Sequence, residues 1–93
     1  MNFYIRVFKS PLDAKPEGWF HEPGKAIDKL VSLSRDLPDD QIVCLQITFS
    51  NAKRYNCEIA AGIVNAYNKL GETIYLTSHI TRFIQQQLNP LTK

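Results

Sequence analysis

The stretch Gln41–Ser50, QIVCLQITFS, decides how this chain folds. Four of its apolar residues recur at the two-residue period of a β-strand and therefore share one face: Val43, Leu45, Ile47 and Phe49. The opposite face is also largely apolar or small: Ile42, Cys44, Gln46 and Thr48. A strand with two such faces is typical of the centre of a sheet that helices cover, so we predict a central strand over residues 41–50.

A second strand is predicted near the N-terminus, over Asn2–Lys9. Its core face consists of alternate apolar residues: Phe3, Ile5 and Val7. The other face carries Arg6 between two aromatic residues, Tyr4 and Phe8. Two interpretations remain open for this face: helices cover it and Arg6 reaches out to water, or it is partly open and available to a partner.

A long loop is predicted over residues 10–23, because its prolines and glycine remove backbone donors and favour turns: Pro11, Pro16, Gly18 and Pro23. The loop contains Trp19-Phe20-His21. This segment is either a short strand that pairs back on the first one or an exposed aromatic patch, since Trp is enriched at the centres of interfaces.

The next element is an amphipathic helix that starts at Pro23 and ends before Pro38. Its apolar residues recur at helical spacing: Ala26, Ile27, Leu30, Val31 and Leu37. We expect this helix to cover one side of the sheet.

A long helix is predicted over residues 51–70, with Ser50 as its N-cap and Gly71 as its left-handed C-terminal residue. Its core stripe is expected to be Ala52, Tyr55, Ile59, Ile63, Ala66, Tyr67 and Leu70. A second stripe of small apolar residues follows the opposite side: Cys57, Ala60, Ala61 and Val64, edged by Arg54, Asn65 and Asn68. This second stripe is either sandwiched inside the fold or offered to another molecule, including a second copy of the chain.

The last predicted elements are a short strand over residues 72–76 and a helix capped by Thr77 or Ser78 that ends at Asn89-Pro90. The inward residues of that helix are Ile80, Phe83, Ile84 and Leu88, and its outer face carries Arg82 and three glutamines.

These elements predict a small α/β domain of two or three layers. It has a sheet of three or four strands, a central strand over 41–50, and three helices in the order strand, helix, strand, helix, strand, helix. Strand–helix–strand connections would make those strand pairs parallel. A chain of 93 residues has room for one core, so residues 1–93 are predicted to form a single compact domain.

Composition indicates an ordinary folded protein, with 44% hydrophobic and 22% charged residues. There is no apolar run near the roughly 20 residues that span a bilayer, so we predict a cytoplasmic protein without a membrane partner. The two cysteines, Cys44 and Cys57, are not in a CxxC pair or a His/Cys cluster, and we interpret them as reduced packing residues.

No catalytic or cofactor pattern is present in the sequence. Ser78 and His79 are neighbours, but neither a serine elbow nor a glycine-rich oxyanion loop accompanies them. The two histidines, His21 and His79, lack the spacing of a metal site, and the glycines do not form a phosphate-binding loop. We therefore predict that the protein is not an enzyme and binds neither cofactor nor metal.

Charge is spread unevenly along the chain, whose net charge is +2. Residues 41–93 contain five basic residues against two acidic ones. Such a mildly cationic half attracts an acidic protein surface or a phosphate backbone, and nothing in the sequence chooses between them.

We therefore predict a non-enzymatic protein-binding module, a small regulator or inhibitor that docks on a larger protein or nucleoprotein complex. The chain has the size of phage or mobile-element anti-defence proteins and of immunity-type proteins, so these classes are candidates. The predicted partner-binding residues are Trp19, Phe20, Lys53, Arg54, Cys57, Ala61, Val64, Asn68 and Arg82. The alternative is a nucleic-acid-binding module that uses the basic start of the long helix, Lys53 and Arg54.

Overall fold

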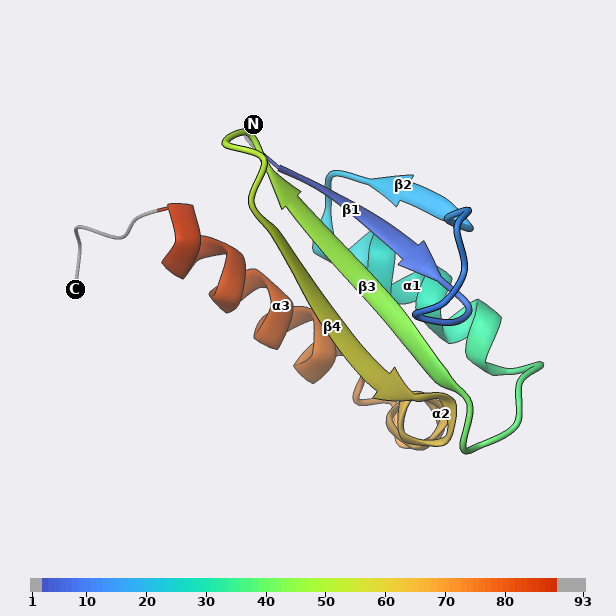
Figure 1. The fold of residues 1–93 in the computed structure, drawn as a ribbon. Helices are drawn as coiled ribbons and strands as arrows, with labels where there is room; N and C mark the ends of the chain where they lie inside the picture. The colour runs from blue at the N-terminus through green and yellow to red at the C-terminus, as the bar shows by residue number, and fades with distance from the viewer. Residues whose placement is uncertain (1–2, 89–93) are drawn as a thin grey trace.

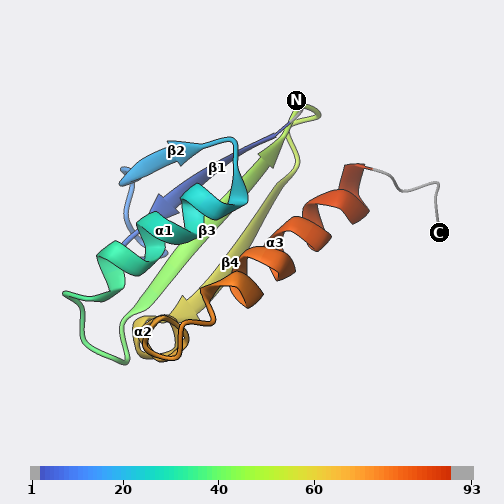
Figure 2. The same cartoon turned by 180° about the vertical axis from the view of Figure 1, so that it is seen from behind.

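The computed structural model describes residues 3–88, which form a four-stranded antiparallel sheet and three helices. The elements in chain order are β1 (Phe3–Phe8), β2 (Gly18–Phe20), α1 (Pro23–Ser34), β3 (Ile42–Phe49), β4 (Arg54–Ala60), α2 (Ala61–Lys69) and α3 (Thr73–Leu88). Figures 1 and 2 show the strands on one side of the molecule and the helices on the other. The predicted α/β class, with up to four strands and with three helices, is confirmed.

The strand β3 lies inside the sheet, whose order is β2-β1-β3-β4. It pairs with β1 from Phe3↔Phe49 to Phe8↔Cys44, and with β4 from Ile42↔Ala60 to Thr48↔Arg54. The prediction of a central strand over residues 41–50 is therefore confirmed. The predicted parallel pairing is wrong, because consecutive strands are joined by hairpins or by α1, and every pair is antiparallel.

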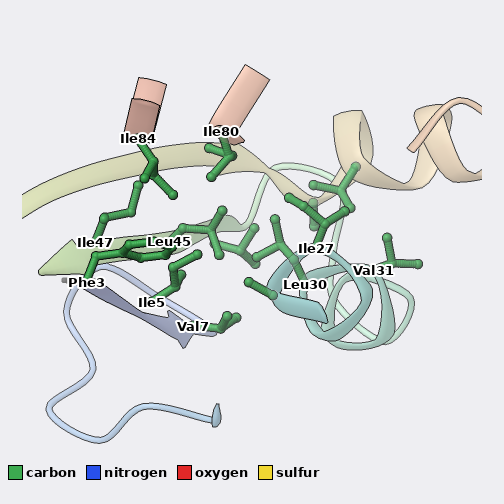
Figure 3. Close-up of a cluster of buried hydrophobic side chains, with 14 of the residues drawn as sticks. Phe3, Ile5, Val7, Ile27, Leu30, Val31, Leu45, Ile47, Ile80 and Ile84 are labelled. Carbon is green, nitrogen blue, oxygen red and sulfur yellow. The ribbon is translucent and has the colours of Figure 1, made fainter. Parts of the chain in front are cut away.

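One cluster of buried side chains joins the sheet to the helices. The alternate residues predicted for the core faces of β1 and β3 all belong to it: Phe3, Ile5, Val7, Val43, Leu45, Ile47 and Phe49. Ala26, Ile27, Leu30 and Val31 join it from α1, and Ile80 and Ile84 from α3. Figure 3 shows Ile80 and Ile84 pointing from α3 toward the strands, above Leu45 and Ile47.

The predicted helix over residues 51–70 is wrong in its first half. Residues Ser50 to Lys53 form a hairpin turn instead, closed by two backbone hydrogen bonds: Phe49 N–H to Lys53 C=O at 2.9 Å and Ala52 N–H to Phe49 C=O at 2.9 Å. The Asn51 side-chain carbonyl accepts a further bond from Lys53 N–H at 3.1 Å. Strand β4 follows the turn, and only Ala61–Lys69 is helical.

The predicted strand over residues 72–76 is also wrong, because α3 already begins at Thr73. The end of α2 explains the start of α3. Gly71 has a φ of 71°, its N–H bonds to Asn68 C=O, and Glu72 N–H bonds to Tyr67 C=O, which together turn the chain sharply. The left-handed role predicted for Gly71 is thus confirmed. The next helix, α3, begins two residues later, at Thr73. The predicted helix end at Asn89-Pro90 lies outside the described residues.

The predicted loop over residues 10–23 contains strand β2. Its residues pair with β1 in the register Ile5↔Phe20, Arg6↔Trp19 and Val7↔Gly18. Of the two interpretations for the Trp19 segment, the structure therefore has the strand, and it also leaves Trp19 60% exposed. Pro23 opens α1, as predicted.

Candidate functional site

One face of the sheet is left uncovered by the three helices in residues 3–88, which all pack on the other face (Figures 1 and 2). Successive side chains of a strand point to opposite faces of the sheet. The odd-numbered residues of β1, β3 and β4 point toward the helices, so the even-numbered ones point to this open face. The pairing aligns Trp19, Arg6, Gln46 and Asn56 in one row across all four strands. Of the two interpretations for the second face of β1, the partly open one is therefore found.

Arg6 stands at the centre of an aromatic group on this face. Its guanidinium carbon Cζ lies 5.3 Å from the ring centroid of Trp19, 5.6 Å from that of Phe8 and 5.9 Å from that of Tyr4. The rings of Tyr4 and Trp19 stack on each other with centroids 5.3 Å apart. These distances lie within the range of cation–π attraction. We call Tyr4, Arg6, Phe8 and Trp19 the Arg6 cluster.

A chain of hydrogen bonds holds the guanidinium in place. Arg6 Nη2 donates to Gln46 Oε1, and Gln46 Nε2 donates to Asn56 Oδ1 at 3.2 Å. Gln46 and Asn56 do not stand out in the sequence, where the available signal is a polar residue inside an otherwise apolar strand. Fixing the side chain in this way lowers the entropy that Arg6 loses when it binds an anion.

The charge of Arg6 is neutralised only in part by these neighbours. Its Nε is buried and has no hydrogen-bond partner among residues 3–88. Aromatic faces and an amide oxygen carry partial negative charge, whereas a carboxylate or phosphate carries a full one and forms stronger, charge-assisted hydrogen bonds. The open face is thus suited to an anionic group placed next to aromatic surface.

The two aromatic residues predicted to bind a partner are separated by the pleat of β2. Trp19 points to the open face and is more exposed than the other large hydrophobic side chains of the strands. Phe20 points the other way and packs, half-buried, against the core. Only Trp19 is therefore placed to meet a partner on this face.

The basic pair Lys53 and Arg54 lies at the hairpin end of β4, and both residues are exposed. The register Tyr4↔Thr48↔Arg54 places Arg54 on the open face, in the row next to that of Arg6. The structure thus brings Arg54 to the same face as Trp19, although not on a helix N-terminus as predicted.

The second apolar stripe predicted for residues 51–70 is not a surface. Ala61 and Val64 are fully buried at the start of α2, and Cys57 is half-buried on the helix side of β4. The expected role of Ala61 and Val64 in docking or in self-association is therefore corrected to a role in the core, whereas Cys57 keeps part of its surface exposed. Asn68 and Arg82 are exposed, on α2 and α3, and are not part of the Arg6 cluster.

The thiols lie in surroundings that keep them protonated at neutral pH. Burial raises the pKa of Cys44 to about 11, and the carboxylate of Glu58 adds to the effect. Burial and Glu58 also raise the pKa of Cys57. Since the thiolate is the nucleophilic and metal-binding form, neither cysteine has the environment of a reactive thiol.

The part of the chain that the structure describes holds no group of three or more His, Cys, Asp or Glu residues able to bind a metal ion. Among the same residues, none of the helices is long and apolar enough to cross a membrane. Comparisons with models of protein families, with curated proteins and with solved structures found no match.

Proposed function

We propose that the protein is a non-enzymatic binding module that docks on a larger protein or nucleoprotein complex through the open face of its sheet. The observation that carries the proposal is the Arg6 cluster, in which a fixed cation lies among three aromatic rings, one of them the exposed Trp19. Trp, Tyr and Arg are the residues most enriched among those that dominate binding energy at protein interfaces.

The partner surface that this geometry fits is acidic at its centre and apolar around it. A carboxylate of the partner approaches Arg6, while apolar or aromatic side chains contact the free side of Trp19. Covering this face would block whatever the partner surface normally binds. A small module with such a surface therefore acts as a regulator or inhibitor.

The test is a capture experiment with the immobilised full chain and a lysate of its source organism. We expect one stoichiometric protein partner, whose recovery falls about tenfold or more with Trp19→Ala and with Arg6→Ala, the loss expected when a dominant interface residue is removed. Leu12→Ala is the matched control. Leu12 is an apolar side chain that is 93% exposed in the loop before β2, and its removal should leave recovery unchanged.

The intrinsic fluorescence of Trp19 provides a direct readout, because it is the single tryptophan of the chain. Titration with the captured partner should shift its emission to shorter wavelength as water is excluded from the ring. An unchanged emission, or equal recovery by Trp19→Ala and Leu12→Ala, contradicts docking through this face.

A second candidate function is nucleic-acid binding, favoured by the position of Arg54 beside the Arg6 cluster. A sheet face that carries an exposed aromatic ring and two arginines can stack a base and hold a phosphate. This candidate predicts retention on heparin or single-stranded DNA that falls steeply with salt and is lost in the Lys53→Ala, Arg54→Ala double variant. Retention that is weak and insensitive to these substitutions leaves the protein partner as the target.

A further inference from the structure

The outer edge of β4 is a second candidate site, separate from the Arg6 cluster, and no strand within residues 3–88 pairs with it. The order β2-β1-β3-β4 makes β4 an edge strand of seven residues, RYNCEIA. It contains no proline or lysine, the residues that commonly protect a strand edge. The opposite edge of the sheet, β2, has only three residues.

The pairing with β3 determines which backbone groups of β4 face outward. Hydrogen bonds join Phe49 to Lys53 and Ala61 to Gln41, at the two ends of the ladder. Because bonded and non-bonded pairs alternate along antiparallel strands, Tyr55, Cys57 and Ile59 direct their N–H and C=O groups toward β3. The residues between them, Asn56 and Glu58, therefore direct theirs toward the free edge, together with Arg54 and Ala60 at the ends.

An apolar groove accompanies this edge on the helix side of the sheet. Two hollows, of about 190 and 160 Å³, lie between β4 and α3 and share Cys57, His79 and Ile80 as walls. The first extends to Tyr55 and Phe83, and the second extends to Ile59 and Leu76. Exposed residues, His79 among them, line both hollows, so the groove reaches the surface beside β4.

From these two features we propose that β4 and α3 form a site for an extended peptide segment of a partner, which adds to the sheet as a fifth strand. The backbone of the peptide bonds to the outward groups of Asn56 and Glu58. Every second side chain of the peptide enters the groove over α3, which is the way strand-adding sites obtain specificity. The two hollows lie on either side of Cys57. Two peptide side chains that point to the helix side, two residues apart, therefore enter one hollow each.

The charges on β4 define the remaining chemistry of the peptide. Arg54 and Glu58 lie on the open face on either side of Asn56, directly opposite the residues that an added strand would present there. Opposite charges in directly facing positions stabilise antiparallel strands. An antiparallel peptide of the pattern basic, apolar, polar, apolar, acidic sets its basic residue against Glu58 and its acidic residue against Arg54.

A single strand fits this edge better than a second copy of the chain does. In Figures 1 and 2, α3 runs along the outer side of β4. The α3 residues His79 and Ile80 line both hollows of the groove. A second copy that paired its own β4 here would bring its α3 to the same side of the junction, into the space that the first α3 occupies. A peptide without a helix of its own meets no such obstacle.

The test uses the full chain and a fluorescein-labelled synthetic peptide whose core reads Lys-Val-Thr-Val-Glu. Fluorescence anisotropy should show saturable binding to the wild-type chain. Asn56→Pro should weaken binding about tenfold or more, because proline removes an outward donor while edge strands tolerate it where the N–H faces solvent. Arg54→Glu should weaken binding through repulsion of the peptide glutamate, and a peptide with both valines changed to serine should lose its contacts with the groove.

Trp19→Ala is the control, because it alters the Arg6 cluster and leaves β4 intact; its peptide affinity should equal that of the wild type. The assignment is overturned if the wild-type chain does not bind the peptide. It is equally overturned if Arg54→Glu binds the peptide as well as the wild type does and the wild type binds the serine peptide as well as the valine peptide. Neither result depends on the stability of Asn56→Pro. It is also overturned if the chain sediments as a dimer that Asn56→Pro dissociates, since the edge then holds a second copy. The capture experiment with Trp19→Ala gives its answer independently of all these outcomes.

Discussion

At the scale of single residues, Ala52 explains why the hairpin was not predicted. It has a φ of 69°, in the left-handed region that residues other than glycine rarely adopt. Three-residue hairpin loops place such a residue last, after a turn, and usually use glycine or asparagine there. Without a glycine at position 52, the segment SNAK matches a helix start, with Ser50 as its cap, as well as it matches a turn.

Replacing Ala52 with glycine should stabilise the protein. The substitution removes left-handed strain, a gain that exceeds the added entropy of the unfolded chain, so we expect about 0.5–1 kcal/mol in the free energy of unfolding. Gly71→Ala is the reciprocal control and should destabilise by about 1 kcal/mol. A Cβ at Gly71 meets nothing within 4 Å, so its cost comes from the backbone alone.

Urea denaturation followed by circular dichroism measures both free energies, with the slope against urea expected to stay constant. A decrease in stability for Ala52→Gly would mean that the hairpin turn of the structure is not the one formed in solution.

At the scale of elements, residues 54–60 show how one sequence matches two periods. Polar residues at 54, 56 and 58 alternate with apolar ones at 55, 57 and 59, which is the strand pattern. Tyr55 and Ile59 also begin a series with Ile63 at helical spacing. Tertiary contacts decide between the strand and the helix. Leu45 and Ile47 of β3 pair with Cys57 and Tyr55, and this pairing cannot be read from the local pattern of residues 54–60.

Because residues 54–60 form a strand, the buried and exposed sides of α2 differ from those expected for a helix over residues 51–70. A helix over residues 51–70 places Ile63 in the core stripe and Val64 in the second stripe on the opposite side, whereas the structure has Val64 fully buried and Ile63 50% exposed. Val64→Ala should therefore cost about 2 kcal/mol of stability, through lost burial and the cavity left behind. Ile63→Ala, one residue away, should change stability by less than about 0.5 kcal/mol.

Chemical denaturation of the two variants side by side tests this assignment. The opposite order of costs, with Ile63 the more sensitive position, would restore the long helix and remove β4 from the fold. Equal and small costs would mean that α2 does not pack on the core.

At the scale of the whole molecule, the helices α1, α2 and α3 pack on one face of the sheet, so that one face and one edge are left uncovered by the residues that the structure describes. The central strand, the core residues of β1 and α1, and the inward residues of α3 were predicted from periodicity, because each contacts its neighbours through one regular stripe. The open face was not decided by the sequence. Whether Arg6 and its aromatic neighbours are covered depends on the number and path of the helices. That path follows from residues 54–60 forming a strand, which is a matter of tertiary contacts.

The same arrangement predicts an alternating pattern of amide hydrogen exchange along β4. The amides of Tyr55, Cys57 and Ile59 bond to β3 and should exchange slowly, close to the rate set by global unfolding. The amides of Asn56 and Glu58 face the free edge and should exchange faster by roughly a hundredfold or more, as expected for groups that open without unfolding the core. Residue-resolved exchange measured by NMR provides both sets in one experiment.

Amides of β3 from Cys44 to Thr48 are the internal control, because this part of the strand is paired with both β1 and β4 and should be protected throughout. If Asn56 and Glu58 are as protected as Cys57 in the isolated protein, the edge is already occupied in solution. Dilution then distinguishes the occupant: protection that falls with protein concentration identifies a second copy, and protection that does not fall identifies a segment of the same chain. Fast exchange that slows only when the peptide is added is the pattern expected for a free edge that receives a partner strand.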